Sequence, residues 1–146
     1  MVRILGKKRM GKFSVTLEVA NYGDITNADA GILTPDKVRR LAIPAVVDSG
    51  ATSLVLPQSV AKQLGLRPID KVRVRYADGR KAMREIVGGV SVQLLGRQTV
   101  LSALVEPKRR TGLIGAIVLE ALDLLVNCAH QRLVPRDPRH VIYEIE

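Results

Sequence analysis

Two apolar runs enclose a short polar turn over residues 45–57, where the sequence is AVVDSGATSLVLP. The first run closes the segment 38–47, and a continuous apolar run of this kind is typical of a strand buried on both faces. Asp, Ser and Gly are turn residues, and Asp-Ser-Gly alone occurs by chance in roughly one chain of this length in twenty. The apolar context is what constrains the fold, because it places Asp48 at a strand end, where we expect chemistry.

Alternation of apolar and polar residues, the period of a half-buried strand, recurs along much of the remaining chain. It predicts a strand over residues 13–19 and a hairpin whose strands cover 72–76 and the stretch up to Leu95. Ala77-Asp78-Gly79 supplies the turn of that hairpin, and Gly88-Gly89 is expected to bend its second strand. Further strands are predicted over 99–105, 124–126, 132–134 and 141–145.

Helical signals are confined to two short segments. Residues 54–65 are expected to form a helix, since Pro57 suits a first turn and Gly65 suits the position after the last turn. Residues 114–122 place apolar side chains on one helical face, whereas residues 21–36 and 107–112 are predicted to be loops. We therefore expect an all-β fold class, mostly β with one or two short helices.

Size and composition favour one domain without a metal site. The 146 residues are 47% hydrophobic, which is enough for a single core. Residues 1–12 are predicted to be a basic, flexible N-terminal tail and residues 13–146 a single domain. Cys128 is the only cysteine, and His130 and His140 lack metal-ligand spacing, so neither a disulfide nor a metal or other cofactor is expected.

Hydrophobic targeting segments are not found in the sequence. No apolar run approaches the roughly 18 residues that a membrane span needs. The first twelve residues contain no apolar core of the ~7–15 residues found in secretory signals. We expect a cytoplasmic protein that does not bind a membrane.

Three motifs follow one another along the chain: DSGAT at residues 48–52, a hairpin tip at Asp78-Gly79, and LIG at residues 113–115. In type and order they resemble the motifs of the retropepsin-like aspartic proteases (clan AA), in particular the small bacterial single-domain members. The resemblance covers about residues 13–146. It implies a retropepsin-like acid protease barrel with one lobe per chain, assembled as a two-fold homodimer.

The resemblance also implies an activity, that of an aspartic endopeptidase acting on a polypeptide. One Asp48 carboxylate would activate a water while its symmetry mate donates a proton, because two carboxyl groups about 3 Å apart share one proton. Ser49 is implied to donate a hydrogen bond across the two-fold axis, and Gly50 to allow close approach of the backbone. The implied substrate-binding residues are Ala51, Thr52, Ala77, Asp78, Gly79, Ile114 and Gly115.

Two other interpretations remain open at this point. One is a dimeric binding module that keeps the protease fold without catalysis. The other is a basic nucleic-acid-binding β protein, because the net charge is +9 and basic residues can track phosphates. The nucleic-acid interpretation is disfavoured, because the basic residues are spread along the chain and four aromatic residues offer few stacking surfaces.

Overall fold

The computed structural model describes residues 4–5, 12–141 and 145 of the chain. It contains a seven-stranded sheet, with strand order β2-β3-β8-β4-β7-β6-β5, and a three-stranded sheet with the order β1-β9-β10. The strands of the large sheet are β2 (Phe13–Asn21), β3 (Arg40–Val47), β4 (Leu54–Pro57), β5 (Pro68–Arg75), β6 (Lys81–Leu94), β7 (Arg97–Glu106) and β8 (Gly112–Ile114). The expected mostly-β class is confirmed.

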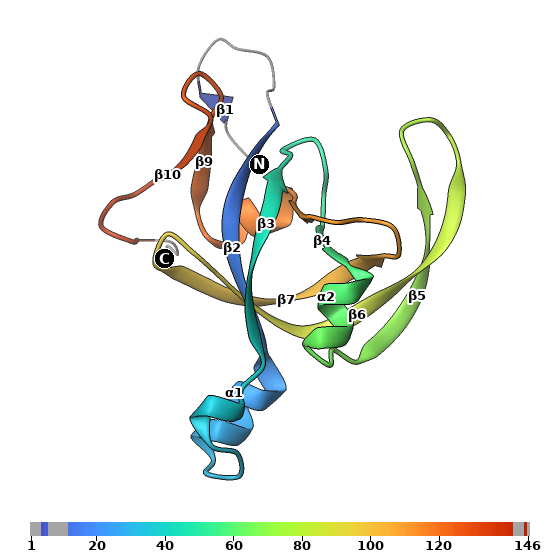
Figure 1. Cartoon of the computed structure of the whole chain (residues 1–146). Coiled ribbons are helices and arrows are strands. Elements are labelled where there is room, and N and C mark those ends of the chain that lie inside the picture. Colours follow the sequence, from blue (N-terminus) through green and yellow to red (C-terminus); the bar gives the residue numbers. More distant parts are fainter. Residues whose placement is uncertain (1–3, 6–11, 142–144, 146) are drawn as a thin grey trace.

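The large sheet curves until its first strand meets its sixth, which makes a barrel (Figure 1). Residues 18–21 of β2 pair with residues 90–93 of β6, while β2 also pairs along its length with β3. On the side of the barrel that carries Asp48, β8 lies between β3 and β4, parallel to β3 and antiparallel to β4. The turn after β3 is therefore enclosed by neighbouring strands rather than left at a sheet edge.

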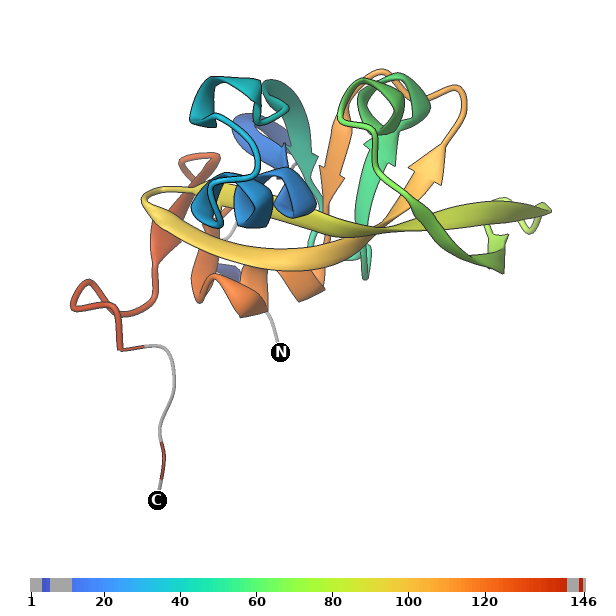
Figure 2. The same ribbon diagram turned by 90° about the horizontal axis from the view of Figure 1, so that it is seen from below.

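The hairpin of β5 and β6 extends away from the barrel as an arm (Figure 2). Its predicted strands and turn are confirmed, with seven pairs of register partners between residues 68–75 and 81–87. The predicted bend at Gly88-Gly89 is also confirmed, because the pairing of β6 with β7 shifts register between Val87 and Val90. The strand predicted over residues 99–105 lies within β7.

The small sheet packs beside the barrel and includes the predicted hairpin of β9 (Leu124–Asn127) and β10 (Arg132–Pro135). A two-residue strand, β1 (Ile4–Leu5), pairs parallel to β9 within the segment expected to be a tail. The buried Arg97 guanidinium of β7 donates to the backbone oxygens of Leu122 and Asp123 at 2.9 and 3.0 Å, which joins the two sheets. The strand expected over 141–145 lies largely outside the described residues.

One strand and one helix differ from their predictions. Residues 54–57 form β4 rather than the first turn of a helix, and only α2 (Gln58–Gln63) is helical. The cause is tertiary, since β4 fills the gap between β8 and β7 and buries all four of its side chains. The prediction that β3 is buried on both faces is wrong for the first part of the strand, where Ala42 and Pro44 are exposed.

The segment predicted to be a loop over 21–36 contains helix α1 (Tyr22–Asp29), and a 3-10 turn, η1 (Pro35–Lys37), follows it. The polar residues taken as loop formers instead cap and anchor the helix. Asn21 accepts a hydrogen bond from the Asp24 N–H at its N-terminus, and Asp24 accepts three from Arg39. The hydrogen bonds from the Arg39 side chain hold the pKa of Asp24 below its ordinary value.

Helix α3 (Ala116–Ala121) follows β8 and lies within the segment predicted to be helical. In the part of the chain that the structure describes, no helix has the length and apolar character needed to cross a membrane.

Candidate active site

The Asp48 loop, residues 48–53, connects β3 to β4 and is held by its own backbone. The Asp48 N–H donates to the oxygen of Ile114 in β8 at 3.0 Å, and the Ala51 N–H donates to the Asp48 oxygen at 3.1 Å. The Gly50 N–H donates to Asp48 Oδ1 at 3.0 Å, which orients the carboxylate. The Asp48 side chain remains 18% exposed, so its other oxygen can meet a ligand or another chain.

The first turn of α3 fixes the second half of the Asp48 loop. The N–H of Ala116 donates to the oxygen of Ala51 at 2.8 Å, and the N–H of Ile117 donates to the oxygen of Thr52 at 2.9 Å. These bonds satisfy donors that a helix N-terminus leaves without intrahelical partners. The structure therefore brings the DSGAT and LIG motifs together through backbone contacts.

Gly115 lies where these two segments touch. A Cβ atom built on it would stand 2.6 Å from the backbone oxygen of Ser53 and 2.6 Å from the carbonyl carbon of Thr52. Its φ of −92° is open to any residue, so close approach and not backbone angle requires glycine here.

A cation that the sequence did not point to lies beside the candidate catalytic carboxylate. Lys12 Nζ is 3.5 Å from Asp48 Oδ2, and the lysine side chain is 63% exposed. Lys12 was assigned to the tail, and nothing in its sequence context relates it to the DSG motif. Because exposed ion pairs contribute only about 0–1 kcal/mol, this contact can be broken at small cost.

An aliphatic row crosses the sheet next to the Asp48 loop. Register partners in adjacent strands share one face of a sheet, and the pairs Val46–Leu113, Leu113–Val55, Val55–Leu104 and Leu104–Ile86 connect five strands in this way. Val55 is 9% exposed and the other four are half-buried. This row is an apolar surface only partly covered by the chain itself.

The opposite face of the same strands is the core. Val47, Ile114 and Leu54 are register partners there and are at most 2% exposed. The structure thus places the Ile114 side chain inside the barrel, where it cannot line a surface, and only its backbone oxygen reaches Asp48. Leu113, which the sequence reasoning did not select, presents its side chain on the partly covered face.

The hairpin tip carries the other predicted site residues, Ala77, Asp78 and Gly79, all of which are exposed. Gly79 has a φ of +89° and donates its N–H to the oxygen of Tyr76 at 2.9 Å. Hydrogen bonds from the backbone and side chain of Arg80 lower the pKa of Asp78. Among the described residues, no hydrogen bond or ion pair joins this tip to the Asp48 loop.

A buttress at the base of the tip, made of Tyr76, Arg84 and Glu106, ties the hairpin to the end of β7. The Tyr76 hydroxyl donates to Glu106 at 2.7 Å, and Arg84 Nε donates to the same carboxylate. Burial, and then the hydrogen bond with Glu106, raise the pKa of Tyr76. The guanidinium carbons of Arg80 and Arg84 lie 5.1 and 5.8 Å from the Tyr76 ring centre. Sequence reasoning missed the buttress, because 30 residues separate Tyr76 from Glu106.

The histidines and the cysteine lie outside this region. His130 and His140 are exposed, and Cys128 is buried in the core. Within residues 4–5, 12–141 and 145, no group of three or more His, Cys, Asp or Glu side chains is arranged to hold a metal ion.

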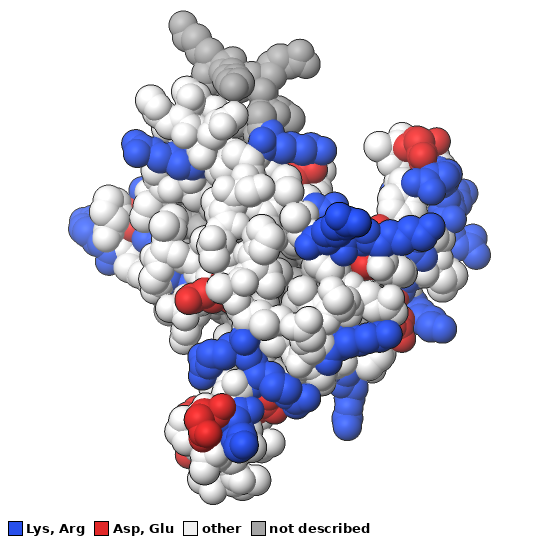
Figure 3. Space-filling model, in the orientation of Figure 1, with Lys and Arg blue, Asp and Glu red and all other residues white. Residues whose placement is uncertain are grey.

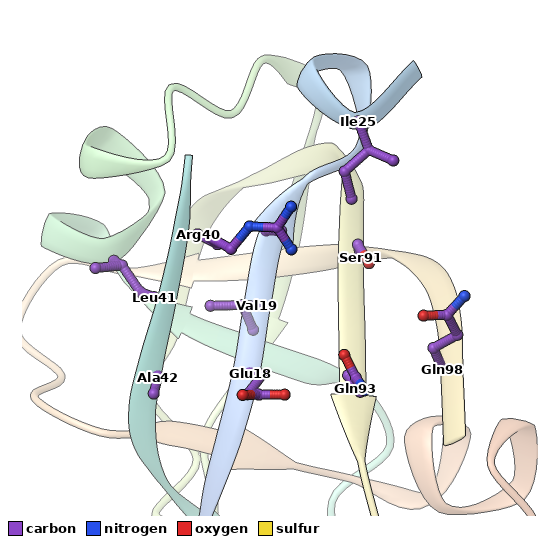
Figure 4. Close-up of a pocket in the computed structure, with 10 residues that line it drawn as sticks. Glu18, Val19, Ile25, Arg40, Leu41, Ala42, Ser91, Gln93 and Gln98 are labelled. Carbon is purple, nitrogen blue, oxygen red and sulfur yellow. The ribbon is translucent and has the colours of Figure 1, made fainter. Parts of the chain in front are cut away.

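A cavity of about 270 Å³ lies on another part of the barrel, between α1 and the strands β2, β3, β6 and β7. Its polar lining includes Glu18, Arg40, Ser91, Gln93 and Gln98 (Figure 4). None of its lining residues belongs to the Asp48 loop, the aliphatic row or the hairpin tip. The cavity is therefore separate from the candidate site.

A comparison of the sequence with known protein families agrees with this geometry. Residues 35–118, more than half of the chain, match the family model described as aspartyl protease. The chain therefore belongs to the aspartyl protease family, and its barrel and motifs are those of the retropepsin-like type.

One solved structure extends the likeness in fold beyond the matched segment. The fold is similar to that of EIAV protease complexed with the inhibitor HBY-793, with 13% sequence identity and a TM-score of 0.56 over 81% of this chain and 94% of that chain. The solution structure of simian foamy virus (mac) protease also matches, with 18% identity and a TM-score of 0.46 over 72% and 91% of the two chains. No curated protein matches the chain.

Proposed function

We propose that the protein is an aspartic endopeptidase whose active site forms when two copies bring their Asp48 carboxyl groups together. The observation that carries this proposal is the position of the Asp48 loop beside a partly covered aliphatic row. The loop is held there by two hydrogen bonds, from the Gly50 N–H to the Asp48 carboxylate and from the Asp48 N–H to the Ile114 oxygen. The sequence holds one Asp-Ser-Gly. One chain then supplies one carboxyl group, and a two-fold axis supplies the second.

The proposed chemistry is general acid and general base catalysis by this pair. One Asp48 carboxylate removes a proton from the attacking water, while the protonated partner gives a proton to the carbonyl oxygen of the peptide bond. The resulting tetrahedral intermediate collapses when a proton reaches the leaving nitrogen. Lys12, which contacts Asp48 Oδ2 in the single chain, would have to yield this position to the second carboxyl group.

The surrounding residues have supporting roles in this proposal. Ser49 donates its hydroxyl hydrogen across the axis, and Ala51 and Thr52 contact the substrate backbone. The aliphatic row receives apolar side chains on either side of the cleaved bond. Residues 77–80 form a flap that closes over the substrate and excludes water, and the buttress sets the position from which the flap closes.

The proposed dimer interface is an intersubunit sheet at the chain ends. One contribution would come from the edge of β2 that does not pair with β3. Residues 18–21 of this edge already pair with β6, which leaves residues 13–17 for such a sheet. The remaining contribution would come from residues 141–145, most of which lie outside the described part.

The test compares the wild type with Asp48→Asn on a diverse peptide library from pH 3 to 8. We expect the amide to abolish cleavage while the dimer is retained in sedimentation, since it can neither accept the water proton nor share one. Asp36→Asn, at an exposed position in η1, is the matched control and should cleave normally. Cleavage by Asp48→Asn, or an active monomer, would overturn the proposal.

A further inference from the structure

The β7–β8 loop, residues 107–111, joins the ends of β7 and β8 that lie away from the Asp48 loop, since Glu106 pairs with Pro57 and Gly112 with Ala45. At one end, Glu106 is bonded to Tyr76 and Arg84 of the hairpin. At the other end, β8 begins at Gly112, and the Ile114 oxygen accepts from the Asp48 N–H. Arg110 is four residues before Ile114, and four residues of extended chain cover at most about 13 Å. Arg110 therefore lies within about 13 Å of Ile114, whose oxygen accepts the hydrogen bond from Asp48.

This loop has the sequence PKRRT and is strongly basic. Arg109 is half-buried and donates to the backbone oxygen of Thr111 at 2.7 Å, so it shapes the loop. Lys108 and Arg110 are exposed and make no ion pair with any residue that the structure describes. Figure 3 shows Lys and Arg side chains gathered between the body of the molecule and the hairpin arm.

Further cations lie on the hairpin, on the face opposite to that of Ile86 and the aliphatic row, because Lys81 and Ile86 are an odd number of residues apart in β6. Arg75 and Lys81 are register partners, both exposed, at the end of the arm, and like charges directly opposite each other on a sheet are destabilising. Arg73 lies two residues away on the same face and is also exposed. These hairpin cations therefore face away from the aliphatic row, whereas the β7–β8 loop leads through Gly112 directly to Leu113 of that row.

We propose that Lys108 and Arg110 determine specificity by selecting polypeptides with Asp or Glu side chains close to the cleaved bond. This inference rests on the proposed protease function. The substrate would place apolar side chains on the aliphatic row and an acidic side chain against the β7–β8 loop, which borders that row through Gly112 and Leu113.

A peptide fits these observations better than a polynucleotide does. Single-stranded nucleic acids are bound by cations together with exposed aromatic rings on which bases stack. Tyr76 is the aromatic residue of the hairpin, and its ring is half-buried, bonded to Glu106 and approached by Arg80 and Arg84. The neighbouring surface is instead an aliphatic row, which suits side chains of an extended peptide.

The experiment uses the best-cleaved peptide of the library in three forms, with Glu, Gln or Lys at each position from four residues before to four after the cleaved bond. Wild type is compared with the double variant Lys108→Glu/Arg110→Glu. Lys37→Glu/Lys62→Glu is the control, because it makes the same change in net charge at exposed positions in η1 and α2. Binding of the same peptides to Asp48→Asn, with and without the loop substitutions, is measured by fluorescence polarisation.

At one or more positions, we expect wild type to cleave the Glu form about fivefold faster than the Gln form, as surface charge pairs allow, and the Lys form more slowly still. The preference should fall as salt is raised and should be lost or reversed in the loop variant but kept in the control. Equal cleavage of Glu and Gln forms at every position would overturn the inference and leave the protease function standing.

If no peptide is cleaved, the proposed function fails. Binding to Asp48→Asn is then measured on library peptides that differ only in carrying Glu, Gln or Lys at one position, and this measurement still decides the inference. Tighter binding of Glu peptides to Asp48→Asn, dependent on Lys108 and Arg110, would support it. Equal binding of all three forms would overturn it. Binding of a single-stranded oligonucleotide that displaces no peptide, and that needs the same two cations, would also overturn it in favour of a nucleic-acid surface.

Discussion

Gly115 and Gly79 represent two ways in which this chain uses glycine, and they lie in regions of opposite character. Gly115 is buried where β8 passes under the Asp48 loop, and an added Cβ would stand 2.6 Å from backbone atoms of Ser53 and Thr52. Gly79 is exposed at the hairpin tip, with a φ of +89° and no heavy atom within 4 Å of an added Cβ. One glycine is required by its neighbours, and the other by its own backbone.

In the proposed enzyme, substitutions near Gly115 should mainly change stability, and substitutions near Gly79 should mainly change activity. The Asp48 loop is held by backbone hydrogen bonds from two sides, so it should be rigid, and damage there should destabilise the fold. The hairpin tip is held at its base by the buttress, so the tip can move without unfolding the barrel. Substitutions in the two regions should therefore differ in what they change.

The largest effect on stability is expected from Gly115→Ala. The new methyl group would meet backbone, which cannot rotate away as a side chain can, so β8 or the Asp48 loop must shift. Overpacking of this kind costs about 3 kcal/mol, and chemical denaturation with two-state analysis would measure it. Cleavage should fall with it, because the Asp48 loop moves.

Gly112→Ala is the matched control, since Gly112 is also buried and lies at the start of β8, three residues before Gly115. There an added Cβ would stand 3.2 Å from Ala45 Cβ and from Ile43 Cδ1. The Ile43 side chain can rotate, and the Ala45 methyl group has to give way by only a few tenths of an ångström, so a smaller cost of about 1 kcal/mol is expected. Equal losses of stability in Gly115→Ala and Gly112→Ala would mean that contact with backbone atoms does not set Gly115 apart. The statement that Gly115 is required by its neighbours would then be wrong.

The next effect is expected from Gly79→Val at the hairpin tip. A β-branched residue with positive φ costs about 1–2 kcal/mol, and the tip adds no buried contact that could be lost. If residues 77–80 close over the substrate, turnover should fall at least about tenfold, because the altered turn holds the tip away from its closed position. Turnover and the midpoint of thermal unfolding are measured on the same preparation.

Gly96→Val provides the same strain without the proposed role. Gly96 lies in the turn between β6 and β7, with a φ of +75° and open space around it. Its thermal unfolding should shift as far as that of Gly79→Val, while turnover stays close to wild type. Unchanged turnover in Gly79→Val would show that the flap has been assigned to the wrong hairpin.

The sequence predicted well those features that depend on neighbours in the chain. Alternation defined the hairpin arm and β2, and the apolar run leading to Asp48 located the candidate site. It failed where partners far along the chain decide. Residues 54–57 became a strand because β7 and β8 flank them, and residues 22–29 became a helix with Asp24 bound to Arg39.

The candidate site shows the same division. The DSGAT and LIG motifs were visible, and their backbone contacts follow from the order of β3, β8 and β4. The sequence did not indicate whether Leu113 or Ile114 would face outward. Both are aliphatic, and β8 has only three residues, too few for a pattern of alternation to show which face each side chain takes. The contacts of Lys12 with Asp48 and of Tyr76 with Glu106 join residues 30 or more positions apart, beyond any local pattern.

The smallest effect is expected at the buttress, which joins the two regions, from Glu106→Gln. The amide keeps the shape of Glu106 and can still accept the Tyr76 hydrogen, but it loses the charge that pairs with Arg84. Hydrogen bonds to charged groups contribute about 1.5–3 kcal/mol, and a neutral bond replaces part of that, so we expect a loss of about 1 kcal/mol. In peptide cleavage, KM should rise more than kcat falls, because the hairpin starts from a less defined position.

A titration of Tyr76 separates loss of the buttress from a general loosening of the fold. Burial and Glu106 raise the pKa of Tyr76 above its ordinary value near 10, so the buttress contributes fully below pH 10 and is lost as the pH rises through the raised pKa. Without the carboxylate, the phenolate is less disfavoured, and the ultraviolet absorbance assigned to Tyr76 by comparison with Tyr76→Phe should appear at lower pH. An unchanged titration in Glu106→Gln would mean that burial alone sets this pKa. The hairpin would then be held at its base by packing rather than by Glu106, and its closure should not respond to the loss of this charge.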